Sequence, residues 1–154
     1  GSIVAKKACL LGADVIACDI YESDELKNKY GIKYVSLSEI FEKSDIITIH
    51  MKATKETEKI IGKDLLSKMK KGSLFINVAR AELVDNESLY ELIKGGHIAG
   101  AAIDVYENEP PKDYKLAELE NVIATPHIGF YTKKANDNSI RLSVESVLNF
   151  LDID

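Results

Sequence analysis

The sequence has only two cysteines and no apolar run that approaches the length of a membrane span. A transmembrane helix needs about 20 consecutive apolar residues, and the N-terminus lacks the basic-then-apolar pattern of a secretory signal. Cys9 and Cys18 lie in apolar stretches and form no metal-ligand pair. We therefore expect no membrane partner, no disulfide framework and no metal site, and we predict a reducing compartment, the cytoplasm.

An excess of basic residues is also missing. The 20 lysines and arginines are outnumbered by 25 aspartates and glutamates, which leaves a formal net charge of −5. Nucleic acids and anionic membranes are bound by basic patches, so neither is an expected partner. Small molecules and other proteins remain. With 154 residues, 45% of them hydrophobic, the chain can bury one sizeable core, and we expect a single domain over residues 1–154.

Helical and strand patterns alternate along the chain, which predicts an α/β fold with a mostly parallel sheet and flanking helices. A helix that Gly12 ends is expected first, over 4–11. Ser36 and Glu39 have capping-box spacing, Asp64 is the expected cap of a helix that includes Met69, and another helix begins at Asn86. The last helix carries an apolar stripe over 140–151. The predicted strands are 14–19, 32–35, 45–50, 73–78, 99–105 and 122–125, and 107–121 is predicted to be a long irregular loop.

The beginning of the sequence matches part of a dinucleotide-binding, Rossmann-like unit. Asp19 ends a strand that follows a helix, where a carboxylate can accept both ribose hydroxyls of an adenosine. No Lys or Arg adjoins it to neutralise a 2′-phosphate, so NAD is favoured over NADP. A cap for the next turn is the alternative role for Asp19. Of the glycine-rich loop only the last glycine, Gly1, is present, so the domain is expected to be incomplete at its N-terminus, without the first, central strand.

Three polar residues at or near strand ends suit the reduction of a 2-keto acid. Arg80 follows the strand at 73–78, and its planar guanidinium could grip a carboxylate. His127 follows the strand at 122–125 and could supply a proton near neutral pH. Glu109, in the loop between the last two strands, could pair with His127 and favour its proton-donating form. The carboxyl ends of parallel strands form one edge, so a shared cleft is expected. The alternatives are a solvated Arg and a His that only hydrogen-bonds its loop.

The stretches NVARAELVD (77–85), AIDVYENEP (102–110) and TPHIG (125–129) resemble the signatures of the D-isomer-specific 2-hydroxyacid dehydrogenases. The resemblance covers residues 1 to about 151. It implies that Arg80 binds the substrate carboxylate and carbonyl, that His127 is the acid/base, and that Glu109 hydrogen-bonds His127. It also implies an NAD site, whose expected residues, together with Gly1, are Asp19, His50, Met51, Thr57, Val78, Ala79, Asp104 and Gly129.

The same resemblance raises expectations about the whole protein. The segment GFYT (129–132) is similar to that of D-lactate dehydrogenases, which suggests a small 2-keto acid such as pyruvate. Family members have a substrate domain before this one and are commonly dimers, so the chain alone should be a poor catalyst and a homodimer is expected. Lys52 and Ala81 depart from the family's Pro and Gly. Two other hypotheses stay open: a catalytically idle nucleotide-binding or structural module of this fold, and a different α/β protein with chance matches.

Overall fold

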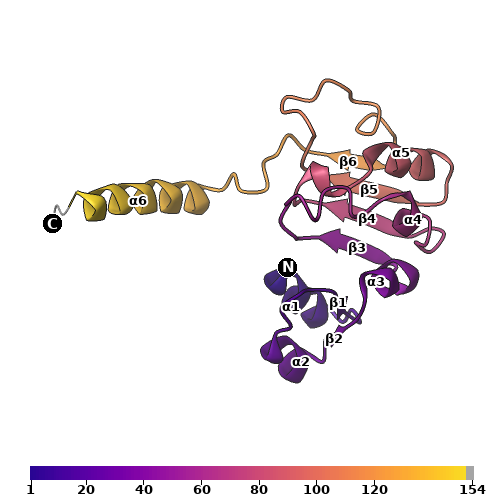
Figure 1. Cartoon of the computed structure of the whole chain (residues 1–154), viewed down its shortest axis with the longest axis horizontal. Helices are drawn as coiled ribbons and strands as arrows, with labels where there is room; N and C mark the ends of the chain where they lie inside the picture. Colours follow the sequence, from indigo (N-terminus) through magenta and orange to yellow (C-terminus); the bar gives the residue numbers. More distant parts are fainter. Residues whose placement is uncertain (152–154) are drawn as a thin grey trace.

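The computed structural model describes residues 1–151, and helices and strands alternate along them (Figure 1). The α/β prediction is confirmed. The strands are β1 (Ile16–Ala17), β2 (Lys33–Tyr34), β3 (Ile46–Ile49), β4 (Leu74–Asn77), β5 (Gly100–Ile103) and β6 (Val122–Ala124). The helices are α1 (Ser2–Leu10), α2 (Asp24–Tyr30), α3 (Leu37–Lys43), α4 (Lys63–Leu66), the 3-10 helix η1 (Ala81–Leu83), α5 (Asn86–Lys94) and α6 (Lys133–Phe150).

The main sheet has four strands in the order β3-β4-β5-β6, and every neighbouring pair is parallel. The pairing of Ile47 with Phe75, of Phe75 with Ala101, and of Ala101 with Val122 sets the register across all four strands. Parallel strands need crossover connections, and α4, η1 and α5 lie in two of these. All four carboxyl ends therefore lie along one edge of the sheet.

Strands β1 and β2 form a separate parallel pair. Within residues 1–151, no strand is hydrogen-bonded to both β1 and β3, which agrees with the prediction that the first, central strand is lacking. In the described residues, β1 and β3 are not paired with each other either. The strand expected over 14–19 is only two residues long, and it pairs with the equally short β2.

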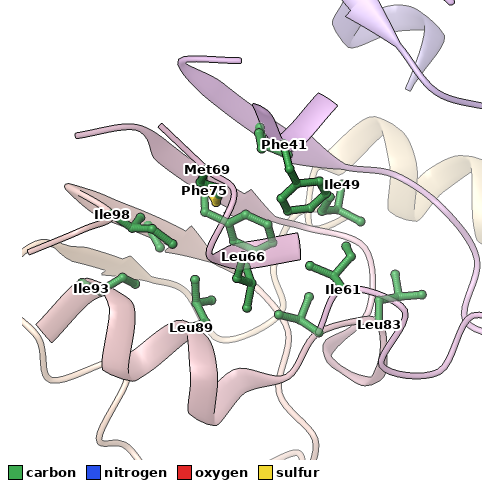
Figure 2. Packing of buried hydrophobic residues seen from close by; sticks show 13 residues of the cluster. Phe41, Ile49, Ile61, Leu66, Met69, Phe75, Leu83, Leu89, Ile93 and Ile98 are labelled. Atoms are coloured by element: carbon green, nitrogen blue, oxygen red, sulfur yellow. The ribbon is translucent and has the colours of Figure 1, made fainter. Parts of the chain in front are cut away.

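The core lies on one face of the four-stranded sheet. Every fully buried member of its cluster lies between Phe41 and Ala101, so α1, α2, β1 and β2 contribute none. Alternation along the strands sends Ile47, Ile49 and Phe75 to this face. Figure 2 shows Ile49 and Phe75 gathered with side chains of α3, α4 and α5. The small unit of α1, α2, β1 and β2 buries its own apolar residues, among them Leu26 and Ile32.

Local capping signals explain several helix boundaries. The capping box of α3 is confirmed: Ser36 Oγ accepts from the Glu39 N–H at 3.3 Å, and Glu39 accepts from the Ser36 N–H at 3.2 Å. The predicted cap at Asp64 is wrong, because α4 has Gly62 at its N-cap, lacks a side-chain cap and ends at Leu66. Helix α2 was not predicted, although Ser23 caps it, because its short polar sequence carries no apolar periodicity.

Helix α6 projects away from the sheets at the end of an extended segment (Figure 1). Its apolar stripe is present as predicted, yet no residue of the helix is buried, and Ile140, Val144 and Val147 are each more than half exposed. A stripe of this width normally packs against a core. Among residues 1–151, no helix combines the length and the apolar character that a membrane crossing requires.

Candidate active site

The turn after β4 places Arg80 at the carboxyl edge of the sheet. Asn77, the last residue of β4, is 2% exposed. Its Oδ1 accepts from the Ala79 N–H at 3.0 Å, and its Nδ2 donates to the Arg80 carbonyl at 2.9 Å. One buried amide therefore shapes the whole turn, while the Arg80 side chain stays exposed, with Nη1 donating to the Ala79 carbonyl at 2.6 Å.

His127 lies beyond β6 and is paired with Glu109. The His127 Nδ1 is 2.8 Å from one Glu109 carboxylate oxygen and 2.7 Å from the other. An ionised carboxylate only accepts hydrogen bonds, so Nδ1 carries a proton and donates it. Nε2 is then the ring atom left for proton exchange. The hydrogen bond from His127 holds the pKa of Glu109 below its ordinary value, so Glu109 is ionised at neutral pH.

Asp104 follows β5 and faces the loop that carries His127. Its Oδ1 accepts from Thr125 Oγ1 at 2.5 Å and from the Ile128 N–H at 2.8 Å, and its Oδ2 accepts from the Gly129 N–H at 2.8 Å. Burial by itself disfavours the carboxylate. The three hydrogen bonds outweigh that cost and hold the pKa of Asp104 below its ordinary value.

The three predicted catalytic residues line one cleft of about 310 Å³, together with Ala81, Glu82, Val105, Tyr106 and Glu107. The cation of Arg80 also contributes to the low pKa of Glu109. A cation, a proton-exchanging imidazole and a carboxylate that orients it therefore share one cavity, an arrangement that can bind an anionic substrate and move a proton at its oxygen. No cluster of metal-binding side chains is present in the described part of the chain.

The residues expected on the adenosine side lie at the ends of β1 and β3. Gly1 begins α1 beside His50: a Cβ at Gly1 would stand 3.5 Å from the His50 Cβ. His50 Nε2 is 3.0 Å from Thr48 Oγ1, and burial lowers the pKa of His50. Asp19 is exposed beyond β1, where its Oδ1 accepts from the Tyr21 N–H at 2.9 Å. That bond is also the turn-capping contact the sequence suggested as an alternative.

The remaining predicted cofactor residues occupy the same edge. Thr57 Oγ1 donates to the Lys52 carbonyl at 2.9 Å and accepts from the Thr54 N–H at 2.8 Å, which closes the loop after β3. Met51 and Ala79 pack against the core cluster, whereas Val78 is 45% exposed. Together with Asp104 and Gly129, they follow the carboxyl ends of β3 to β6.

Sequence reasoning gave no role to Asn77, Tyr106 or Thr125. Tyr106 donates its hydroxyl to the Thr125 carbonyl at 3.0 Å, and its N–H donates to Glu109 at 3.3 Å. Asn77 did carry a signal, because an Asn that follows a buried strand commonly forms a turn through its own side chain. Tyr106 and Thr125 carried none, since their contacts join segments far apart in the sequence.

The family described as "D-isomer specific 2-hydroxyacid dehydrogenase, NAD binding domain" matches residues 1–129. The D-3-phosphoglycerate dehydrogenase of Bacillus subtilis is 42% identical over 97% of this chain and 29% of its own length. The aromatic 2-oxoacid reductase of Clostridium sporogenes is 41% identical over 88% of this chain and 45% of its own length.

Solved structures agree. A D-lactate dehydrogenase from Aquifex aeolicus, complexed with NAD and lactic acid, superposes with a TM-score of 0.93 at 34% identity, over 99% of this chain and 50% of that one. An NAD-complexed D-isomer-specific 2-hydroxyacid dehydrogenase from Lactobacillus delbrueckii ssp. bulgaricus gives a TM-score of 0.91 at 32% identity. The chain thus spans half or less of the length of these relatives.

Proposed function

Because the chain belongs to the D-isomer-specific 2-hydroxyacid dehydrogenase family and matches its NAD-binding domain, we propose that it is the cofactor-binding half of an enzyme that transfers a hydride between NADH and a small 2-keto acid. Pyruvate is the proposed substrate, on the similarity of residues 129–132 to D-lactate dehydrogenases. The observation that carries the proposal is the His127–Glu109 pair in one cleft with Arg80. An idle module of the same fold would not need these three side chains to share a cavity.

Arg80 is the proposed anchor of the substrate. Its guanidinium offers parallel donors that match a carboxylate, and the positive charge can polarise the adjoining carbonyl. The buried amide of Asn77 holds the turn, so the guanidinium extends from a backbone that is already in place. Less ordering is then required when the substrate binds.

His127 is the proposed acid and base. Reduction of the carbonyl places negative charge on its oxygen, and a proton delivered from Nε2 neutralises that charge as it develops. Glu109 keeps the proton on Nδ1 and compensates the positive charge of the protonated ring. In the reverse direction, neutral His127 accepts the hydroxyl proton of the 2-hydroxy acid at the same atom.

NAD is the cofactor of this domain family, and its nicotinamide supplies or accepts the hydride when it is bound. The residues present fit that group. The absence of a Cβ at Gly1 leaves room beside His50 at the start of α1, where backbone N–H groups can receive a phosphate. We assign the ribose hydroxyls to Asp19, the adenosine-side loop to His50, Met51 and Thr57, and the nicotinamide pocket to Val78, Ala79, Asp104 and Gly129.

Calorimetric titration of the chain with NAD and NADP tests the cofactor assignment. NAD should bind more tightly, because the Asp19 carboxylate accepts ribose hydroxyls and repels a 2′-phosphate. Asp19→Asn should narrow the difference in affinity between NAD and NADP. The matched control is Asp14→Asn, at another exposed aspartate in the same segment, and it should leave that difference unchanged. Equal affinities for NAD and NADP in the unaltered chain would refute the role of Asp19.

A chimera tests the reaction. Residues 1–151 would replace the matching half of the Aquifex aeolicus D-lactate dehydrogenase, and NADH oxidation would be followed with pyruvate, glyoxylate and an aromatic 2-oxoacid. Arg80→Gln and His127→Gln should each lower kcat/KM at least 100-fold. Arg141→Gln and His97→Gln, which alter residues that do not line the cleft, should not. An active chimera that tolerates His127→Gln would contradict the proposal, and the three substrates decide between pyruvate and larger acids.

Two further parts of the proposal concern the setting of the enzyme. The two cysteines are free, as in proteins of a reducing compartment such as the cytoplasm. We also propose a homodimer and a substrate domain that closes over the cofactor, both on family resemblance. Light scattering measures whether the protein is a dimer. Without the substrate domain, the isolated chain should show negligible pyruvate-dependent NADH oxidation.

A further inference from the structure

We propose that Asp104 is the positioning residue of the catalytic imidazole: its buried carboxylate holds the loop 125–129 in the one conformation that aims His127 at Glu109. This role is additional to the nicotinamide contact that family resemblance assigns to Asp104, and it rests on the proposed function of His127.

The carboxylate of Asp104 is committed to the loop through both oxygens. Only 5% of the residue is exposed. Oδ1 accepts from Thr125 Oγ1 and the Ile128 N–H, and Oδ2 accepts from the Gly129 N–H, so residues on both sides of His127 are tied to one side chain. Hydrogen bonds to an ionised acceptor are about twice as strong as neutral ones. A buried, ionised carboxylate with three donors can therefore hold residues 126–129, which lie beyond the backbone hydrogen bond from the Thr125 N–H to the Ile103 carbonyl in the β5–β6 ladder.

The loop needs such support because His127 has an unfavourable backbone conformation. Its φ is +55°, in the left-handed region that non-glycine residues seldom adopt. Two residues later, a Cβ on Gly129 would lie 2.9 Å from Asp104 Oδ2. The glycine therefore allows the loop to close onto the carboxylate, and this closure keeps His127 in its left-handed state.

Asp104 also begins the segment that leads to Glu109, five residues later. Between Asp104 and Glu109, Tyr106 donates its hydroxyl to the Thr125 carbonyl and its N–H to Glu109. Thr125, in the loop that carries His127, therefore has two side-chain contacts with the segment that leads to Glu109. Its hydroxyl donates to Asp104, and its carbonyl accepts from Tyr106. When Asp104 releases the loop, the ring and the carboxylate lose their common support.

The test uses the isolated chain and needs no turnover. The Glu109 side-chain carboxyl would be followed by carbon NMR against pH in four proteins: unaltered, Thr125→Val, Thr125→Ser and Asp104→Asn. Because the hydrogen bond from His127 lowers the pKa of Glu109, release of the loop raises the titration midpoint. We expect Thr125→Val and Asp104→Asn to raise it in the same direction as His127→Ala does, and Thr125→Ser, which keeps the hydroxyl, to leave it unchanged.

The ring signal of His97 serves as the internal control, because its Nε2 contacts the Met69 carbonyl at 2.8 Å in a different part of the fold. A Glu109 midpoint that stays unaltered in Thr125→Val and Asp104→Asn, with His97 unaltered, would overturn the proposal. If Asp104→Asn also moves His97, the protein has lost its fold and the Thr125 pair decides. Failure of the proposed function would look different: an inactive chimera in which the Glu109 midpoint still depends on Thr125.

Discussion

The separation of β1 and β2 from the main sheet predicts that the chain opens in two independent steps. Leu26 is 3% exposed and packs within the small unit of α1, α2, β1 and β2, whereas the core cluster begins at Phe41. Truncation of a buried leucine to alanine costs about 2–5 kcal/mol, and less where the surroundings can relax. For Leu26→Ala we expect the low end, about 2–3 kcal/mol, because the small unit can collapse around the lost side chain.

Hydrogen exchange measured segment by segment tests this expectation. At about 1.4 kcal/mol per factor of ten, Leu26→Ala should lower the protection of α2 and β2 by roughly 30- to 140-fold and leave β4 unchanged. The matched variant is Leu89→Ala, at a fully buried position of α5, which should lower protection in β4 and α5 instead. Equal loss of protection in α2 and β4 after Leu26→Ala would refute the two-unit reasoning.

The cofactor adds a second arm to this experiment. Asp19 lies in the small unit and Asp104 follows a strand of the main sheet, so a dinucleotide held by both would link them. A ligand at 100 times its Kd adds about 2.7 kcal/mol to the state that binds it. Saturating NAD should therefore restore most of the protection that Leu26→Ala removes from α2. If NAD protects the main sheet alone, the assignment of Asp19 to the ribose is wrong.

Three further predictions concern the main sheet and the cleft. Phe75→Ala, at a fully buried position of β4, should lower the free energy of unfolding by about 3–5 kcal/mol in urea titrations, and a loss below about 1 kcal/mol would contradict its place in the core. Gly100→Ala should lower the free energy of unfolding by about 1–3 kcal/mol, because the new Cβ would lie 2.5 Å from the Asn121 carbonyl oxygen. The matched control in the same titrations is Gly62→Ala, whose Cβ would lie 3.6 Å from the Lys59 carbonyl oxygen. The lowered pKa of Glu109 stabilises the fold fully above its ordinary value of 4.5, and this contribution disappears as the pH falls through the lowered folded value. His127→Ala should therefore flatten the pH dependence of unfolding in that acidic window, and an unchanged profile would show that the pair does not form in solution.

The catalytic candidates could be found from sequence because parallel strands bring their carboxyl ends to one edge. Arg80 and His127 each follow an apolar run, and that placement alone predicted a shared cleft; both side chains line the cleft of about 310 Å³. Glu109 was a weaker inference, since it lies in an irregular loop whose path no periodicity describes. Its contact with His127 depends on how 104–109 and 125–129 pack.

Other features were beyond the reach of sequence patterns. The position of Asp64 favours a helix start, but the backbone at Gly62 is already extended and begins α4 earlier, so the expected cap lies inside the first turn. The stripe on α6 predicts a buried face, yet the path of the preceding segment carries the helix away from the sheet. Both outcomes depend on where neighbouring segments lie, which local composition does not encode.

The sequence by itself determined the alternation of elements, the apolar face of each main strand and the identity of the chemical groups at the strand ends, because these follow from side-chain periodicity and residue chemistry. Tertiary structure decided the rest. It left β1 and β2 as a separate pair, because backbone hydrogen bonds form only between strands that lie side by side, and it exposed α6. It also made the carboxylate of Asp104 a three-donor support for His127, since the donors come from a loop that only folding brings within reach.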